Sequence, residues 1–238
     1  MRLNKFIASE GIYSRRKADE AIKNGLVKVN GETITLLGTK INPEKDKITL
    51  KDHLIEPSSK KIYIAFNKPE GVTSTSKDPF AKKTVFDCID PPIPHLHITG
   101  RLDKKSEGLM ILTNDGDLTY YVTHPKFKCE KEYQVRIKGE LSEENRKKIE
   151  KGVMLKEFTT QKAQLNSIQK KKGETFLHII IHEGKKRQIR EMFSTLGYPV
   201  IYLNRIRIGG LTLGTIPKGN FKFISKAELK KAFPNFLN

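Results

Sequence analysis

The hydrophobic positions near the start of the chain follow a helical spacing twice and then change to an alternating one. Apolar residues recur on one helix face within residues 3–7 and again within 18–22. Ser14 is placed to cap the second helix, which is expected to run to about residue 24. Residues on both sides of Asn30-Gly31 alternate, and this dipeptide is the strongest short hairpin signal. The beginning of the chain therefore predicts a unit of two helices and a hairpin.

The longer remainder predicts strands with helices interspersed among them rather than in strict alternation. Strands are expected at 62–66, 109–113, 133–137 and 176–181, and helices are expected after Ser142, over 188–196 and after Ser225. This order favours an α+β fold in which a mixed, mainly antiparallel sheet has flanking helices. We expect the first domain at 1–55, a polar linker at 56–61 and the second domain at 62–238.

The net charge of the chain indicates what kind of partner it binds. The 238 residues include 45 Lys and Arg against 27 Asp and Glu, which gives a net charge of +18. A polycation of this kind neutralises phosphates and releases their counterions, so we expect a nucleic-acid partner, with plain solubility or a lysine-rich composition as the alternative. From residue 61 onward there are still 33 basic against 19 acidic residues. The nucleic-acid surface is therefore not confined to the first domain.

Other compositional features narrow the class further. No apolar run reaches the ~18 residues that a membrane span requires, and residues 1–5 lack the apolar core of a secretory signal. Cys88 and Cys129 are too few for a disulfide framework and lack the spacing of metal ligands. We therefore expect a cytoplasmic protein that binds no membrane and no metal.

Three cations in succession begin the second helix, where the helix dipole prefers anions. Arg15, Arg16 and Lys17 occupy this first turn. Free backbone N–H groups together with three cations would form a phosphate clamp, while a solvated charge run is the alternative. Ser14–Ala18 followed by Val27–Gly31 resembles the small RNA-binding module (alpha-L motif) of a small-subunit ribosomal protein and of several RNA-modifying enzymes. The resemblance implies that these three cations and Lys28 contact RNA.

A single acid stands out in the basic second domain. Asp103 ends the run Gly100-Arg101-Leu102-Asp103, just before an apolar strand. A carboxylate amid so much positive charge is expected to be ionised, which suits a nucleophile or a stabiliser of an electron-poor sugar carbon rather than a general acid. A structural acid that pairs with Arg101 or Lys104 is the alternative.

Five segments in a fixed order resemble the motifs of RNA pseudouridine synthases of the RsuA type. They are Asn67–Val72, Gly100–Asp103 with Gly108-Leu109 and Leu112–Gly116, Lys131–Val135, Glu183–Met192 and Leu203–Gly209. Together with the N-terminal module they cover nearly the whole chain. Thr123-His124-Pro125 is closer to the large-subunit rRNA branch of that family than to the small-subunit branch.

The resemblance implies a reaction and roles for individual residues. Uridine would be isomerised to pseudouridine on a flipped-out nucleotide, with Asp103 as the nucleophile and without a cofactor. Tyr133 would stack on the base, and Arg190 would pair with Asp103 and keep it oriented. The other residues expected to bind substrate are Arg101, Leu102 and Leu203.

The resemblance also extends the RNA surface into the second domain. Arg187 is expected to meet an RNA phosphate, and Arg205 and Arg207 are expected to line one strand face towards RNA. The partner would be ribosomal RNA, and the enzyme would act as a monomer. The alternatives are a synthase for small-subunit rRNA and a non-catalytic RNA-binding factor of ribosome assembly built on the same scaffold. A glycoside or nucleoside hydrolase is disfavoured, because it usually needs a second catalytic carboxylate.

Overall fold

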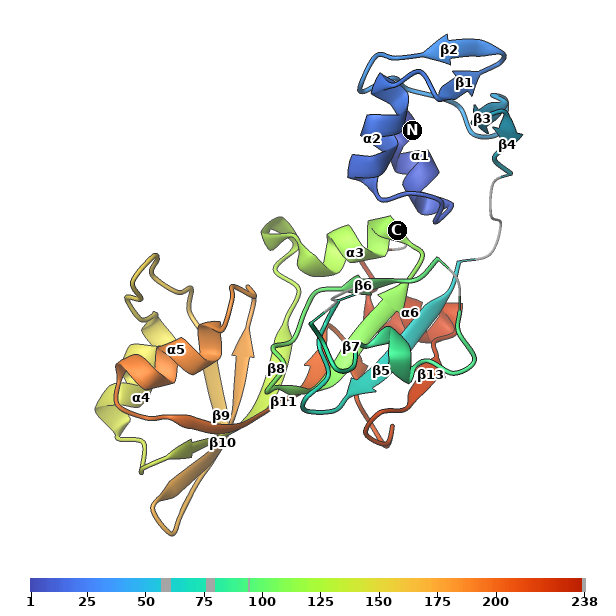
Figure 1. Cartoon of the computed structure of the whole chain (residues 1–238). Coiled ribbons are helices and arrows are strands. Elements are labelled where there is room, and N and C mark those ends of the chain that lie inside the picture. The colour runs from blue at the N-terminus through green and yellow to red at the C-terminus, as the bar shows by residue number, and fades with distance from the viewer. Residues whose placement is uncertain (57–60, 76–79, 94, 237–238) are drawn as a thin grey trace. The chain divides into compact units, whose positions relative to one another are not determined.

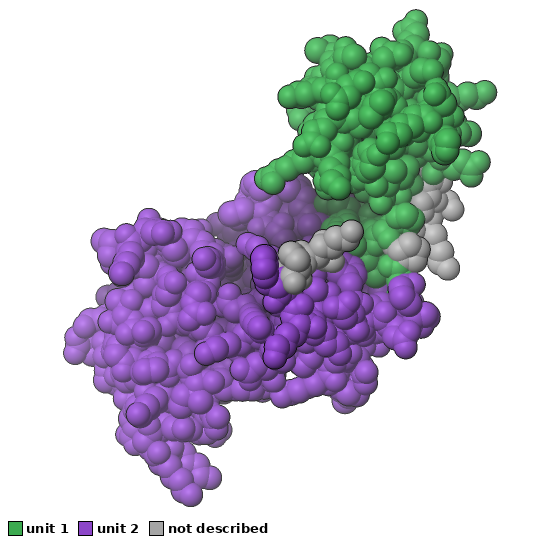
Figure 2. Space-filling model, in the orientation of Figure 1, with its two compact units in different colours: residues 1–62, 93–97, 113–116 green, residues 63–92, 98–112, 117–238 purple. Residues whose placement is uncertain are grey.

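A computed structural model describes residues 1–56, 61–75, 80–93 and 95–236. The chain divides into two compact units, shown in different colours in Figure 2. Unit 1 comprises residues 1–62 with 93–97 and 113–116, and unit 2 comprises 63–92, 98–112 and 117–238. Most of the linker expected at 56–61 lies outside the described residues.

Unit 1 contains two helices and a small antiparallel sheet of order β2-β1-β3-β4. The elements are α1 (Leu3–Ser9), α2 (Arg15–Lys23), β1 (Val27–Val29), β2 (Glu32–Ile34), β3 (Ile48–Leu50) and β4 (His53–Leu54). Helices and strands share one apolar cluster, to which Phe6, Ile22 and Val27 each contribute a fully buried side chain. The predicted helix-helix-hairpin unit is confirmed. Strands β3 and β4 were not predicted, because segments of three and two residues carry too little periodicity.

Unit 2 is built on a nine-stranded sheet whose main path is β13-β5-β7-β11-β8-β10-β9. The strands are β5 (Tyr63–Lys68), β6 (His97–Thr99), β7 (Glu107–Thr113), β8 (Lys131–Lys138), β9 (Gln164–Lys171), β10 (Glu174–Ile181), β11 (Val200–Ile208), β12 (Leu211–Thr212) and β13 (Phe221–Phe223). Strand β11 is parallel to β7 and antiparallel to β8, while β10 is antiparallel to both β8 and β9. The sheet is therefore mixed and mainly antiparallel, as predicted.

Helices flank the two ends of this sheet (Figure 1). They are α3 (Gly116–Thr123), α4 (Glu143–Lys151), α5 (Gln188–Thr195) and α6 (Lys226–Ala232), with the short 3-10 helices η1 (Phe86–Cys88) and η2 (Pro125–Phe127). Leu118 of α3 and Leu229 of α6 join the apolar cluster formed by β5 and β7. Helices α4 and α5 lie at the β8–β10 end of the sheet. Along β8, buried residues such as Val135 alternate with exposed ones such as Gln134, so this end of the sheet has one packed and one open face.

Candidate active site

A cavity of about 460 Å³ opens on the packed face of the unit 2 sheet. Its walls come from the loop before β7, from strands β8 and β11, and from the segment that leads into α5. Among its lining residues are Arg101, Leu102, Asp103, Tyr133, Arg187, Leu203 and Arg205. Residues more than 100 positions apart in the sequence thus meet in one hollow, and they come from four of the five motifs.

The backbone of the loop that carries Asp103 is fixed by hydrogen bonds to two buried polar side chains. The ammonium group of Lys68 donates to the carbonyl oxygens of Asp103 at 3.2 Å, Ser106 at 2.7 Å and Pro69 at 3.1 Å. The hydroxyl of Ser74 donates to the Leu102 carbonyl at 2.7 Å and accepts from the Leu102 N–H at 3.2 Å. The backbone is therefore fixed on both sides of the peptide unit that presents the carboxylate.

Lys68 belongs to the first motif, and its role was not foreseen from the sequence. The side chain is fully buried, and burial lowers its pKa to about 8, while the charges of Glu107 and Asp103 raise it. The ammonium form therefore prevails at neutral pH, where the surrounding carbonyl oxygens are its acceptors. Lys68 is the last residue of a strand whose six residues are all buried, and lysine is almost never fully buried unless it is paired.

A guanidinium group lies beside the aromatic ring of Tyr133. The Arg205 guanidinium is 5.9 Å from the ring centre, and it donates to the Leu109 carbonyl at 2.7 Å and to the Tyr133 hydroxyl at 3.5 Å. Its second terminal nitrogen is buried without a hydrogen-bond partner among the described residues. Lys131 lies two residues before Tyr133, on the same strand face, and burial lowers its pKa. Lys131 was missed in the sequence, although the period of two along a strand points to it.

Strands β7 and β11 approach each other closely at the edge of the cavity. Gly108 has φ of +107°, a value that favours glycine, and a Cβ atom there would collide with the backbone of Arg205 and the side chain of Asn204. Glycine at this position therefore lets the parallel pair β7–β11 form, which in turn places Arg205 and Leu203 beside the Asp103 loop.

Arg190 lies near Asp103 but is not its ion-pair partner in the described part of the chain. Its guanidinium donates to the carbonyls of Lys105 at 2.7 Å and Val200 at 3.1 Å, and to the Ser106 hydroxyl at 3.4 Å. Burial lowers the pKa of Arg190, as does Arg187, while the Asp103 charge raises it. In place of the expected direct pair, the two terminal nitrogens of Arg190 connect the backbone of the Asp103 loop to that of β11.

The expectation that Arg205 and Arg207 share a strand face is wrong. Arg205 is opposite Tyr133 and is 4% exposed, whereas Arg207 is opposite Glu132 on the other face. The pairing register shifts between them, so one extra residue in β11 reverses the alternation. Arg207 contacts Glu132 at 2.7 Å and Glu130 at 2.9 Å.

The basic residues predicted in unit 1 are accessible. Arg15, Arg16 and Lys17 are exposed on the first turn of α2, and the Ser14 hydroxyl accepts from the Lys17 N–H at 3.3 Å, as a cap should. Lys28 is partly exposed on β1 and contacts Asp52 at 2.7 Å. No acidic residue lies in the first turn of α2, so its three cations face the positive end of the helix dipole together.

The described residues contain neither a membrane-spanning helix nor a cluster of potential metal ligands. None of their helices is long and apolar enough to cross a bilayer. None of their His, Cys, Asp and Glu side chains form a group of three that could hold a metal ion.

Known proteins match both units. Residues 62–195 match the family model described as RNA pseudouridylate synthase, and residues 1–48 match the S4 domain. The ribosomal large subunit pseudouridine synthase B of Bacillus subtilis (strain 168) is 38% identical over 97% of this chain and 94% of its own length. An uncharacterized RNA pseudouridine synthase of Aquifex aeolicus (strain VF5) is 34% identical over 98% and 94%. The crystal structure of a pseudouridylate synthase covers 98% of this chain and 99% of its own, with a TM-score of 0.69 at 30% identity. The chain is therefore a pseudouridine synthase of the RNA pseudouridylate synthase family, with an S4 domain at its N-terminal end.

Proposed function

We propose that this enzyme isomerises a specific uridine of large-subunit ribosomal RNA and that Asp103 is its nucleophile. The observation that carries the proposal is the cavity itself: a carboxylate on a doubly anchored loop shares one hollow with an aromatic ring and buried cations. The size of the cavity, about 460 Å³, suits a single flipped-out nucleotide. The target subunit is suggested by the Bacillus subtilis relative, whose name assigns it to the large subunit.

In the proposed reaction, the Asp103 carboxylate attacks the sugar carbon that bears the base. The carbon–nitrogen bond breaks, the base turns and rejoins the sugar through a ring carbon, and the carboxylate is released. The proton on that ring carbon leaves, and the former glycosidic nitrogen gains one, so no electrons are exchanged with an outside group. The step therefore needs an ionised carboxylate and a surface on which the detached base can be held.

Tyr133 and its cationic neighbours are proposed to supply that surface. The Tyr133 ring would stack on the base, with Leu203 packing against it from β11. Arg205 and Lys131 would stabilise negative charge on the detached uracil, since both are buried cations that line the cavity. Arg190 is a positioning residue in this proposal, because it holds the loop at Lys105 rather than contacting the reacting atoms.

Binding of the RNA outside the cavity is proposed to involve both domains. Residues 1–55 would form the RNA-binding domain and 62–238 the catalytic domain. Arg15, Arg16, Lys17 and Lys28 would meet phosphates through the first, and Arg187 and the cavity rim residue Arg101 would do so through the second. We propose that the enzyme acts as a monomer in the cytoplasm.

Mapping pseudouridines in ribosomal RNA from cells with and without this protein tests the proposal. Loss of one modification in large-subunit RNA, restored by the wild-type chain and not by an Asp103→Asn variant, is the expected result. A lost site in small-subunit RNA would correct the substrate and leave the chemistry in place. An unchanged map in both subunits would contradict the ribosomal assignment.

A further inference from the structure

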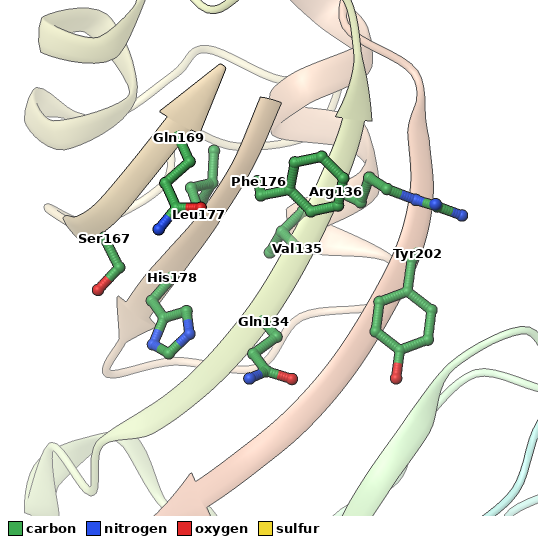
Figure 3. A pocket seen from close by; sticks show the side chains of 9 residues that line it. All are labelled: Gln134, Val135, Arg136, Ser167, Gln169, Phe176, Leu177, His178 and Tyr202. Atoms are coloured by element: carbon green, nitrogen blue, oxygen red, sulfur yellow. The ribbon is translucent and has the colours of Figure 1, made fainter. Parts of the chain in front are cut away.

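The open face of strands β11, β8, β10 and β9 carries a hollow of about 490 Å³ that is separate from the active-site cavity. Figure 3 shows the side chains that line it, contributed by all four strands. The face belongs to the same sheet, because alternate residues of β8 point to opposite sides: Tyr133 faces the active site, and Gln134 faces the hollow.

The pairing register arranges this open face in two rows. In the first row, Tyr202, Arg136, Phe176 and Gln169 lie opposite one another across β11, β8, β10 and β9. In the second row, Asn204, Gln134, His178 and Asn166 do the same. The first row thus offers flat surfaces, and the second offers hydrogen-bonding groups of both kinds. Strands are spaced ~4.8 Å apart, so each row spans ~14 Å, the reach of several bases.

We propose that this open face is a second RNA-binding surface, which takes single-stranded nucleotides of the substrate RNA outside the modified uridine. Exposed aromatic rings on a four-stranded sheet are a general way to stack unpaired bases. The Phe176 ring is 38% exposed, and the Arg136 guanidinium is 5.9 Å from its centre. Bases would stack on Phe176 and Tyr202, while the second row would contact base edges.

Charge favours RNA over a protein partner at this surface. Lys138 and Lys171 flank Glu174 at the end of the face that leads to the β9–β10 turn, and both are exposed. Lys172 lies in that turn. Phosphates that follow the bases stacked on Phe176 would pass this basic end. An apolar protein surface would find few counterparts among the glutamine, asparagine and histidine side chains of the second row.

Strand β9 contains a β-bulge beside the polar residues that line the hollow. The register of β9 and β10 shifts between Phe176 and His178, and Ser167 adopts φ of +52°. The bulge places both Asn166 and Ser167 among exposed residues. Bulges of this kind re-aim side chains, and here the result is an additional hydroxyl at the edge of the hollow.

The proposal goes beyond the isomerisation and can fail separately from it. The probe is a fluorescent oligoadenylate of about eight nucleotides, which has no uracil for the active-site cavity. Its affinity for the full chain is measured for the wild type, for Phe176→Ala and for Phe223→Ala. Phe223 is the matched control, since it is a 61% exposed aromatic residue on β13 of the same sheet. We expect Phe176→Ala to weaken binding about tenfold and the control to leave it unchanged.

A second pair of variants tests the charge. Arg136→Gln should weaken binding and reduce the salt slope by about one unit, whereas Lys147→Gln on α4 should do neither. Ultraviolet crosslinking of the same oligoadenylate to the wild type should label Phe176 or Tyr202, and this result does not depend on the folding of any variant. Equal affinity of wild type and Phe176→Ala, equal losses in variant and control, or crosslinks found only elsewhere would overturn the proposal.

Discussion

The ammonium group of Lys68 donates a hydrogen bond to the backbone oxygen of Asp103 at 3.2 Å. This contact joins the end of β5 to the loop before β7 and explains why two motifs that lie 35 positions apart act on the same carboxylate. Lys68 does not touch the cavity, so it acts through the backbone that carries Asp103. Loss of its donors would leave several carbonyl oxygens buried without partners, which is costly in a protein interior.

We predict that Lys68→Met lowers kcat about a hundredfold and leaves RNA affinity nearly unchanged. Methionine fills a similar volume but offers no donor, so the Asp103 loop shifts, and small displacements of a reacting group cost about this much. Single-turnover kinetics and RNA binding measure the two quantities. A variant that keeps full turnover would show that the Ser74 contacts alone hold the loop.

The lowered pKa of Lys68 predicts that the stability of the protein depends on pH. The folded-state pKa of Lys68 is about 8, lower than its ordinary value, so between pH 8 and the unfolded-state value the unfolded chain binds the extra proton. The contribution of Lys68 to the free energy of unfolding therefore rises with pH in this window and is lost as pH falls through 8. We expect urea unfolding to show that the free energy of unfolding of the wild type, relative to that of Lys68→Met, is larger at pH 9.5 than at pH 7.5. The increase should be at most about 1.4 kcal/mol per pH unit.

Asp103→Asn should abolish isomerisation while RNA affinity changes less than about threefold. The amide has the same shape but cannot attack the sugar carbon. Release of tritium from uridine labelled at the ring carbon measures the reaction directly, and Glu140→Gln, an exposed acid of the same domain, is the control for lost charge. Turnover retained by Asp103→Asn would remove this residue from the chemistry.

Arg190→Lys should reduce kcat about tenfold or more, with little change in KM or melting temperature. A lysine ammonium cannot bridge the carbonyls of Lys105 and Val200 as the guanidinium does. Arg146→Lys, the same substitution on the surface of α4, serves as the control. A variant that only melts earlier, with turnover unchanged below its melting point, would make Arg190 purely structural.

Replacing Arg15, Arg16 and Lys17 by Ala should weaken rRNA binding and reduce the salt slope by up to about three units. A control triple of Lys40, Lys45 and Lys47, all exposed in unit 1, removes the same charge elsewhere. Salt titrations of both triples separate a specific clamp on α2 from overall charge. Equal effects in the two triples would argue against the clamp.

Strand alternation and helix-capping residues in the sequence correctly predicted several elements of the fold. Alternation along residues 133–137 identified β8, and the Ser225–Glu228 capping box, which the structure confirms, identified the start of α6. The first turn of α2 was also predicted, with Ser14 as its cap. Each of these signals depends on neighbours within a few residues, which a sequence displays directly.

Features that depend on contacts between distant segments were not predictable. The register shift that separates Arg205 from Arg207 arises from pairing with β8 and has no local signature. Helix α3, which begins at Gly116, was not among the expected helices. The carbonyl cluster around Lys68 is assembled by the fold, and the sequence shows only a lysine at the end of a strand.

The alternation along β8 has a consequence for engineering this enzyme. Odd-numbered positions from 131 to 137 face the buried side with the reacting groups, while even-numbered positions face the open side. A mutant library restricted to the even positions therefore alters the proposed second RNA-binding surface and leaves the β8 residues that line the active-site cavity unchanged. A one-residue insertion in the same strand would exchange the two sides and destroy both properties at once.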